Sequence, residues 1–238
     1  MANAIMANLL NLQSKKQILA SIDLLASNHH ILKKQCEAKM FNIHQKAIQN
    51  ACVNNPETIA QVMLTTINSI RTGWYLVGNM NKDVNKLGLD SRFMNNRVKA
   101  MAFKYIHRNK KDIAIAFKDY SIGKMSLCDL LLNIAECPGL GLPKAGFVIQ
   151  LALGQIGCLD SHNMARFGLS PSTFKFGSNA TISLKRKKAQ LYIDTCEKLG
   201  GCEYLWNTWC NYLADINPNK YENGFHVSKL HQDFILGE

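Results

Sequence analysis

The 238 residues carry 47% hydrophobic side chains, which is enough for a packed core and excludes a disordered chain. No apolar run approaches the about 20 residues of a membrane-spanning helix, and the start of the chain lacks the basic segment and cleavage site of a signal peptide. The net charge of +11 favours polyanionic partners, nucleic acid first, and the alternatives are solubility or an anionic membrane surface. From the cysteines, interpreted as reduced, and the lack of a spanning segment we expect an intracellular protein of the cytoplasm or nucleoid that binds no membrane.

Helical periodicity runs through almost the whole chain and strand-like alternation is nearly absent, so we predict an all-α fold. Asn55 precedes Pro56 and can cap a helix that begins there, and Ser126 is a further expected N-cap. The pair Gly200-Gly201 is expected to end a helix. The predicted helices cover residues 15–50 (as one or two helices), 56–79, 95–108, 112–120, 126–136, 144–153, 186–199 and 203–216.

Basic residues are concentrated in two segments of the chain. Residues 97–124 hold eight Lys and Arg residues against two acidic ones, and residues 175–188 hold five basic residues and no acid. Such clusters are typical of nucleic-acid contacts. The second segment ends in a run that either contacts phosphates or forms a solvated helix start: Lys185, Arg186, Lys187 and Lys188.

A glycine turn, Cys-Pro-Gly-Leu-Gly, separates two predicted helices at 137–141. Gly139 and Gly141 let the backbone approach a ligand, and the next helix begins with unpaired N–H groups at its positive end. With Lys144 beside it, this turn is expected to bind a phosphate. The alternative is a helical corner whose glycines serve sterics alone.

Asp160 follows an apolar approach and opens the short polar segment Asp160-Ser161-His162-Asn163. A carboxylate in such a place can stabilise a developing positive charge or activate a nucleophile. It can also cap a helix at 161–167. The two roles are compatible, because capping orients the carboxylate.

These segments resemble the helix–hairpin–helix DNA glycosylases, which cut the bond between a damaged or modified base and its deoxyribose. The matches, in order over about residues 55–170, are PETIAQVMLTTINSI, GLDSRFMNNRVKAMAFKYI, SLCDLLLNIAECPGLGLPKAGFVIQLALG and LDSHN. The resemblance implies a monomer with a two-lobed helical fold that flips a base out of duplex DNA. Residues 1–54 would then complete one lobe, and residues 171–238 would pack back on the core.

The resemblance also implies site residues. Asp160 would be the essential carboxylate, and Lys144 would be a nucleophile that forms a Schiff base and adds strand cleavage. The hairpin is one residue longer than the family pattern, so either Leu142 is extruded and Lys144 takes the lysine place, or Pro143 takes it and Lys144 contacts phosphate. The further expected DNA contacts are Gly139, Gly141, Leu142 and Gly146.

No cofactor or metal is expected. Cys196, Cys202 and Cys210 lack the spacing of the iron–sulfur quartet that several relatives carry, and the His pairs have no matching ligand set. The eight cysteines are interpreted as reduced core residues. The candidate base-pocket side chains are Trp74, Tyr75 and His162, although an aromatic pair on a helix can also belong to the core.

Two other functions remain open at this point. One is a base-modifying enzyme of DNA on the same scaffold, like the viral α-glutamyl/putrescinyl thymidine pyrophosphorylase group, which would act in the host cytoplasm. The other is a helix–hairpin–helix protein that binds DNA without catalysis. Fold alone does not separate these functions, because function depends on a few side chains of the site.

Overall fold

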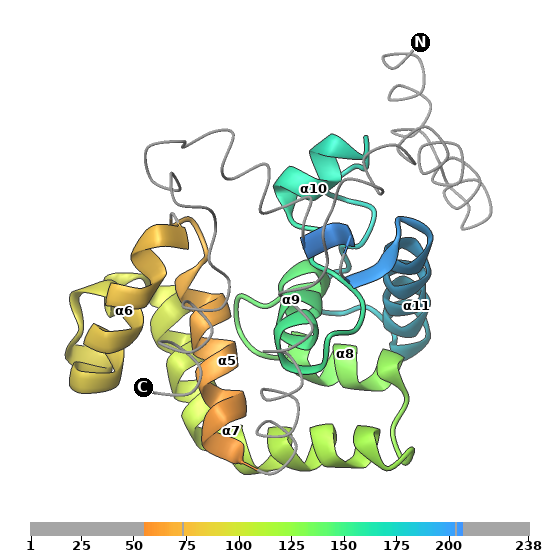
Figure 1. The fold of residues 1–238 in the computed structure, drawn as a ribbon. Helices are drawn as coiled ribbons and strands as arrows, with labels where there is room; N and C mark the ends of the chain where they lie inside the picture. Colours follow the sequence, from red (N-terminus) through yellow and green to blue (C-terminus); the bar gives the residue numbers. More distant parts are fainter. Residues whose placement is uncertain (1–54, 73, 203, 207–238) are drawn as a thin grey trace.

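The computed structural model of the chain describes residues 55–72, 74–202 and 204–206, and every regular element in these ranges is a helix (Figure 1). The predicted all-α class is confirmed for this part of the chain. The α-helices are α5 (Pro56–Asn68), α6 (Trp74–Leu87), α7 (Arg97–Ser121), α8 (Leu127–Ala135), α9 (Leu142–Leu153), α10 (Ser161–Arg166) and α11 (Ile182–Lys198). Two short 3-10 helices, η1 (Gly88–Asp90) and η2 (Arg92–Asn95), lie between α6 and α7. The helix expected at 15–50 lies outside the described residues, as does most of the one expected at 203–216.

Two predicted helix assignments around α5 and α7 are wrong. The helix expected at 56–79 is in fact two, because α5 ends at Asn68 and Arg71, in the turn before α6, has a left-handed φ of 53°. The helices expected at 95–108 and 112–120 are one continuous helix, α7. Residues 109–111 contain no helix breaker, and the Asn109 side chain donates a hydrogen bond to Tyr105 O at 2.8 Å.

The predicted N-caps are confirmed. Asn55 accepts a hydrogen bond from the N–H of Glu57, and Ser126 accepts one from the N–H of Asp129. The paired glycines that follow α11 both have positive φ, as expected for the end of a helix. Local signals in the sequence therefore fix where several helices begin and end.

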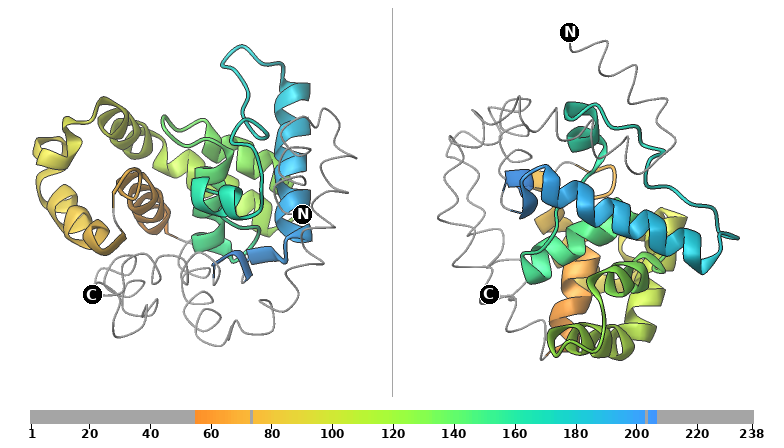
Figure 2. Two further views of the ribbon diagram at one scale, coloured as in Figure 1. Left: turned by 90° about the horizontal axis from the view of Figure 1, so that it is seen from above. Right: turned by 90° about the vertical axis from the view of Figure 1, so that its right-hand side faces the viewer.

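α5 lies at the centre of the described structure, where it packs against α6, α7 and α9 (Figures 1 and 2). Its residues Ile59, Met63 and Ile67 are fully buried. They belong to one apolar core that also contains Phe117 of α7 and Phe147 of α9. α8 and α9 pack against each other, and α11 packs on α8. The core thus joins α5–α7 to α8–α11.

Candidate functional site

The turn between α8 and α9 is held against the end of α5 and the start of α7. Its residues Cys137 and Leu140 are buried, and the N–H of Leu140 donates to Cys137 O at 2.9 Å. Gly139 has a φ of +84°, and a Cβ there would come within 2.7 Å of Val98 Cγ1. The backbone conformation and the close contact with α7 both require glycine at position 139.

Gly141, in contrast, is not required by sterics. Its φ of −78° and ψ of 177° are open to any residue, and a Cβ there would meet only Pro143 Cδ at an ordinary 3.9 Å. Gly141 is also exposed. The missing side chain of Gly141 leaves the start of α9 uncovered. The alternative of a helical corner with glycines for steric reasons therefore explains Gly139 but not Gly141.

α9 begins without a side-chain cap. Five other described α-helices each begin with a capping side-chain oxygen, from Asn55, Asn96, Ser126, Asp160 and Thr181. Within the described residues, the N–H groups of Gly139, Gly141 and Leu142 make no hydrogen bond. Two donors on exposed residues, the N–H groups of Gly139 and Gly141, are therefore available to an anionic ligand near the positive end of α9, and the N–H of the buried Leu142 lies beside them.

Lys144 lies in the first turn of α9 and is half-buried. Its Nζ is 3.4 Å from the hydroxyl of Ser69, which follows α5, and 5.4 Å from the centre of the Phe147 ring. Among the described residues, no carboxylate forms an ion pair with Lys144. The amine is thus held near a hydroxyl and a ring face instead of an opposite charge.

The hairpin lacks the bulge that the first sequence alternative expects, while the second alternative, in which Pro143 takes the lysine place, stays a prediction. Leu142 is not extruded: it is the first residue of α9 and only 1% exposed. The apolar side chain fills the core, so the extra residue of the turn is absorbed by starting the helix earlier. Lys144 nevertheless points towards the end of α5, without a bulge at Leu142.

Asp160 is the N-cap of α10, as one of the two sequence interpretations expects. Its Oδ1 accepts from the N–H groups of His162 (3.1 Å) and Asn163 (3.0 Å). Its Oδ2 makes no hydrogen bond to any described residue, and the side chain is half-buried. The cap therefore fixes the carboxylate while one oxygen is left for another partner.

The charges of Asp160 and Lys144 both act on the buried thiol of Cys158. Burial, and after it the Asp160 charge, raise the pKa of this thiol to about 12. The Lys144 charge acts on the same thiol in the opposite direction and lowers its pKa. Both charged groups are thus within electrostatic reach of one buried atom, although they are 16 residues apart in the chain. Neither Cys158 nor Ser69 belongs to a motif that would have marked it in the sequence.

The other expected site residues lie in different surroundings. Gly146 is buried, and a Cβ there would come within 2.5 Å of the Tyr192 hydroxyl, so its contact is with α11. His162 is exposed in α10. Trp74 and Tyr75 open α6, and their side chains lie outside what the structure describes.

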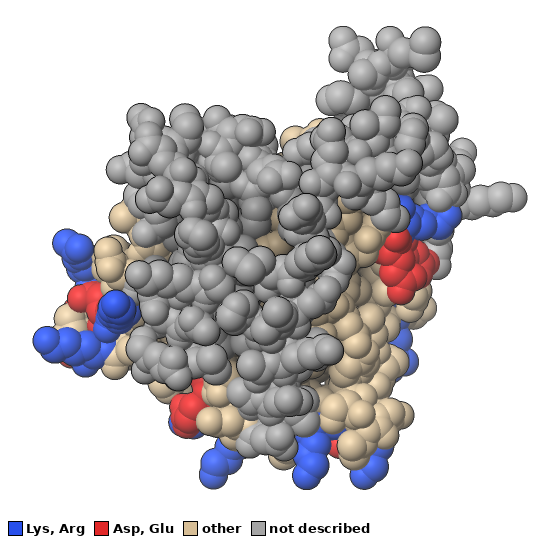
Figure 3. Space-filling view, viewed as in Figure 1, with Lys and Arg blue, Asp and Glu red and all other residues tan. Residues whose placement is uncertain are grey.

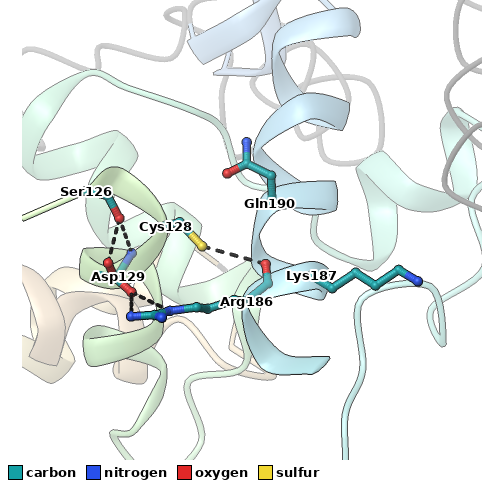
Figure 4. A pocket seen from close by; sticks show the side chains of 6 residues that line it. All are labelled: Ser126, Cys128, Asp129, Arg186, Lys187 and Gln190. Carbon is teal, nitrogen blue, oxygen red and sulfur yellow. Dashed lines mark hydrogen bonds and ion pairs between the residues drawn. The ribbon is translucent and has the colours of Figure 1, made fainter. Parts of the chain in front are cut away.

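The basic run at the start of α11 borders a pocket of about 510 Å³ between α8 and α11 (Figure 4). Arg186 reaches across to Asp129, with its Nη2 2.9 Å from Oδ1. Lys188 donates to Thr173 O at 2.6 Å, and Lys185 lies 6.0 Å from the Phe176 ring centre. Lys187 points away from the other labelled side chains (Figure 4) and has no partner among the described residues. The pocket is lined by Ser126, Cys128, Asp129, Arg186, Lys187 and Gln190.

One face of α7 carries a row of exposed cations. On the face of the molecule in Figure 3, Lys and Arg side chains gather along the lower edge, where α7 runs. Lys110, on the flank of this helix, forms an ion pair with Glu57. The exposed cations of the row have no ion pair with any described residue: Arg97, Lys104, Arg108, Lys111 and Lys118. This row is open to a polyanion.

The cysteines described by the structure are free, and Cys196 and Cys202 lie in the core. Cys210 and the histidine pairs His29/His30 and His226/His231 lie outside the described residues. In the described part, His, Cys, Asp and Glu form no group of three that could hold a metal ion. No helix of the same part is both long and apolar enough to span a membrane. Comparisons of the chain with protein-family models, with curated proteins and with solved structures found no match.

Proposed function

We propose that the protein is a DNA N-glycosylase that binds DNA through a helix–hairpin–helix motif and excises a damaged or modified base. One observation carries this proposal: the open, uncapped start of α9 is adjacent to Lys144, whose charge acts on the same buried thiol as that of Asp160. A phosphate-binding turn and a carboxylate close to each other are what base removal from a DNA strand needs.

The binding step uses the backbone donors of the turn. A phosphate oxygen would accept from the N–H groups of Gly139, Gly141 and Leu142, which have no other partner among the described residues. This contact is independent of sequence and fixes the position of the strand. The cations of the α7 row and Lys187 would add long-range attraction for the duplex.

The chemical step uses Asp160. Loss of the base leaves positive charge on the deoxyribose, and the free Oδ2 of Asp160 would stabilise that charge. The C–N bond breaks, a water molecule then attacks the anomeric carbon, and the proton that this water loses leaves with the base. Lys144 offers a second route, in which its neutral amine attacks instead of water and the resulting imine permits strand cleavage.

The proposed fold places α8, the turn and α9 as the helix–hairpin–helix motif in a two-lobed glycosylase scaffold with its core at residues 55–170. The order of the elements favours this proposal, because the turn, Lys144 and Asp160 follow one another as in that family. The packing of α5 against both α7 and α9 places the turn beside residues of other helices, where a site between lobes would lie.

The test is base release from duplexes that carry a panel of damaged and modified bases, measured by chromatography. The wild type should release one class of base, and Asp160→Asn should lose at least about a thousandfold in rate. Asparagine is also a good N-cap, so the variant should keep its fold and its DNA affinity. Asp129→Asn is the matched control. Asp129 lies on α8 and is ion-paired with Arg186 of α11, so this variant should not change the rate of base release.

The two alternative functions give different products. A base-modifying enzyme would leave the base in the strand with a changed mass, which mass spectrometry of the digested DNA would detect. A protein that only binds DNA would retain salt-sensitive affinity and change no nucleoside. Equal release rates for wild type and Asp160→Asn would show that Asp160 is a helix cap and nothing more.

A further inference from the structure

The segment that joins α9 to Asp160, residues 154–160, contains a strained backbone position. Ile156 has a φ of 45°, which is rare for any residue but glycine and particularly unfavourable for a β-branched one. The side chain is buried, with 5% of its surface exposed. Strained positions persist only where surrounding contacts hold them, and they cluster at functional sites. The contacts of this connecting segment therefore identify what fixes Asp160.

Three buried hydroxyl and amide side chains bind the backbone of the connecting segment, and the buried Cys196 thiol also donates to Gly157 O at 3.4 Å. The Tyr192 hydroxyl accepts from the N–H of Leu159 at 2.9 Å and donates to Gly157 O at 2.6 Å. Gln150 Oε1 accepts from the N–H of Cys158 at 3.0 Å, and Asn163 Nδ2 donates to Cys158 O at 2.7 Å. Tyr192, Gln150 and Asn163 are at most 2% exposed, so these bonds are shielded from solvent.

Tyr192 is the one member of this set that also touches the first turn of α9. Its hydroxyl lies 3.5 Å from Pro143 O, and Pro143 directly precedes Lys144. The phenol occupies the space that a side chain at Gly146 would need. Burial raises the pKa of Tyr192 well above its ordinary value, so the hydroxyl stays protonated. A single hydroxyl thus contacts the backbone next to Asp160 and the backbone next to Lys144.

We infer that Tyr192 is a positioning residue, whose hydroxyl holds the connecting segment against α9 and so sets the distance between the Asp160 carboxylate and the Lys144 amine. That Tyr192 holds the connecting segment follows from the contacts alone, whereas the effect of this contact on base release rests on the proposed function. A misplacement of reacting groups by about 1 Å can cost a hundredfold in rate, so a lost hydroxyl should reduce chemistry more than binding.

The test compares Tyr192→Phe with Thr195→Val. Both variants remove one buried hydroxyl from α11, but the Thr195 hydroxyl bonds only to Leu191 O of the same helix. Hydrogen exchange of the Leu159 amide, measured by NMR, reports the hydrogen bond from this amide to Tyr192 and does not depend on catalytic activity. The exchange should be about fivefold faster in Tyr192→Phe than in wild type or Thr195→Val. The single-turnover rate of base release should fall between about tenfold and a hundredfold, with DNA affinity unchanged within about twofold.

A second variant covers the case in which Tyr192→Phe does not fold. Gly146→Ala keeps the hydroxyl but displaces it, because the new Cβ would lie 2.5 Å from it, and it should give the same pattern. Unchanged Leu159 exchange in both variants would overturn the inference. Faster exchange with an unchanged release rate would overturn the positioning role and leave the proposed function intact. If the wild type releases no base, the proposed function fails, and the exchange result alone decides whether Tyr192 holds the segment.

Discussion

At the scale of single residues, Lys144 is unusual because a lysine, which is usually exposed to solvent, is here half-buried. Its amine lies beside the Ser69 hydroxyl and the Phe147 ring, and no carboxylate of the described residues forms an ion pair with it. Among the described residues, Lys144 thus lacks the kind of ion pair that Arg186 makes with Asp129. A lysine nucleophile needs an amine that no carboxylate holds, and the contacts of Lys144 meet this need.

We predict that Lys144 forms a Schiff base with an abasic duplex. The sugar aldehyde condenses with the amine, water leaves, and borohydride reduces the imine to a stable adduct that a denaturing gel resolves. Lys144→Gln should reduce the adduct at least about tenfold, while Lys86→Gln, which removes an exposed cation of α6 that has no proposed role in DNA binding, should not. An adduct that persists in Lys144→Gln would mean that another amine reacts.

Absence of an adduct in the wild type would leave Lys144 as a phosphate contact. Lys144→Gln should then weaken DNA binding by about 1 kcal/mol.

At the scale of elements, the two glycines of the α8–α9 turn do different things. Gly139 is required by its positive φ and by the contact with Val98. Gly141 is free of both demands, and its lack of a side chain leaves α9 as the one α-helix without a side-chain cap among the α-helices whose N-caps the structure describes. An uncapped helix start is less stable, which is a reasonable cost if a ligand supplies the missing acceptor.

Gly141→Ser should therefore stabilise the protein and weaken DNA binding. The serine hydroxyl would cap α9, which adds a few tenths of a kcal/mol to the free energy of unfolding. It would also lie over the donors that a phosphate needs, so DNA affinity should fall several-fold, as measured by fluorescence anisotropy. Ser126→Ala is the comparison, because it removes an existing cap, should cost about 1 kcal/mol, and should leave DNA affinity unchanged. Unchanged affinity in Gly141→Ser would count against the turn as the phosphate site.

The elements also show how far local sequence signals reach. The caps Asn55, Ser126 and Asp160 were predictable, because each depends on a side chain and amides two or three residues away. The end of α5 was not predictable, because Arg71 enters the left-handed region without glycine or proline. The proximity of Lys144 to Ser69 depends on how α9 packs on α5, and the Tyr192 contacts join segments more than 30 residues apart. No local pattern encodes such distances.

At the scale of the whole molecule, the net charge of +11 and the unpaired α7 row predict salt-sensitive DNA binding. Neutralising about five phosphates should give a slope of about −4 to −5 when the logarithm of affinity is plotted against the logarithm of salt concentration. Anisotropy titrations between low and moderate salt measure this slope. Charge removal at Lys104, Arg108 and Lys111 together should make the slope shallower by up to about 3. A slope near zero in the wild type would exclude binding through phosphates.

The buried thiols predict a loss of stability in alkali. Burial raises the pKa of Cys137 and of Cys158 to about 12, and raises that of Cys196 as well. In the unfolded chain these thiols ionise near pH 8.5, so above that pH the unfolded state binds fewer protons and the free energy of unfolding falls. The fall is at most about 1.4 kcal/mol per pH unit for each thiol. Lys99 opposes it, because burial lowers its pKa and its folded form gains stability as pH rises.

Urea unfolding under reducing conditions at pH 8, 9 and 10 measures this effect. Three thiols outweigh one ammonium, so the free energy of unfolding should decrease over this range. Cys196→Ala should be less stable at pH 8 but should lose less stability between pH 8 and pH 10. A free energy of unfolding that rises with pH would contradict the burial of these thiols.

The length of α7 has a consequence for how the molecule melts. Its 25 residues form one rod of about 37 Å that contacts both α5 and α8. Because α7 packs against both groups, unfolding of either α5–α7 or α8–α11 removes contacts that stabilise the other. We therefore expect the described helices to unfold as one cooperative unit. DNA bound only at the α8–α9 turn should then raise the melting temperature of α5 and α6 as well, because mass action stabilises every element that unfolds in the same transition.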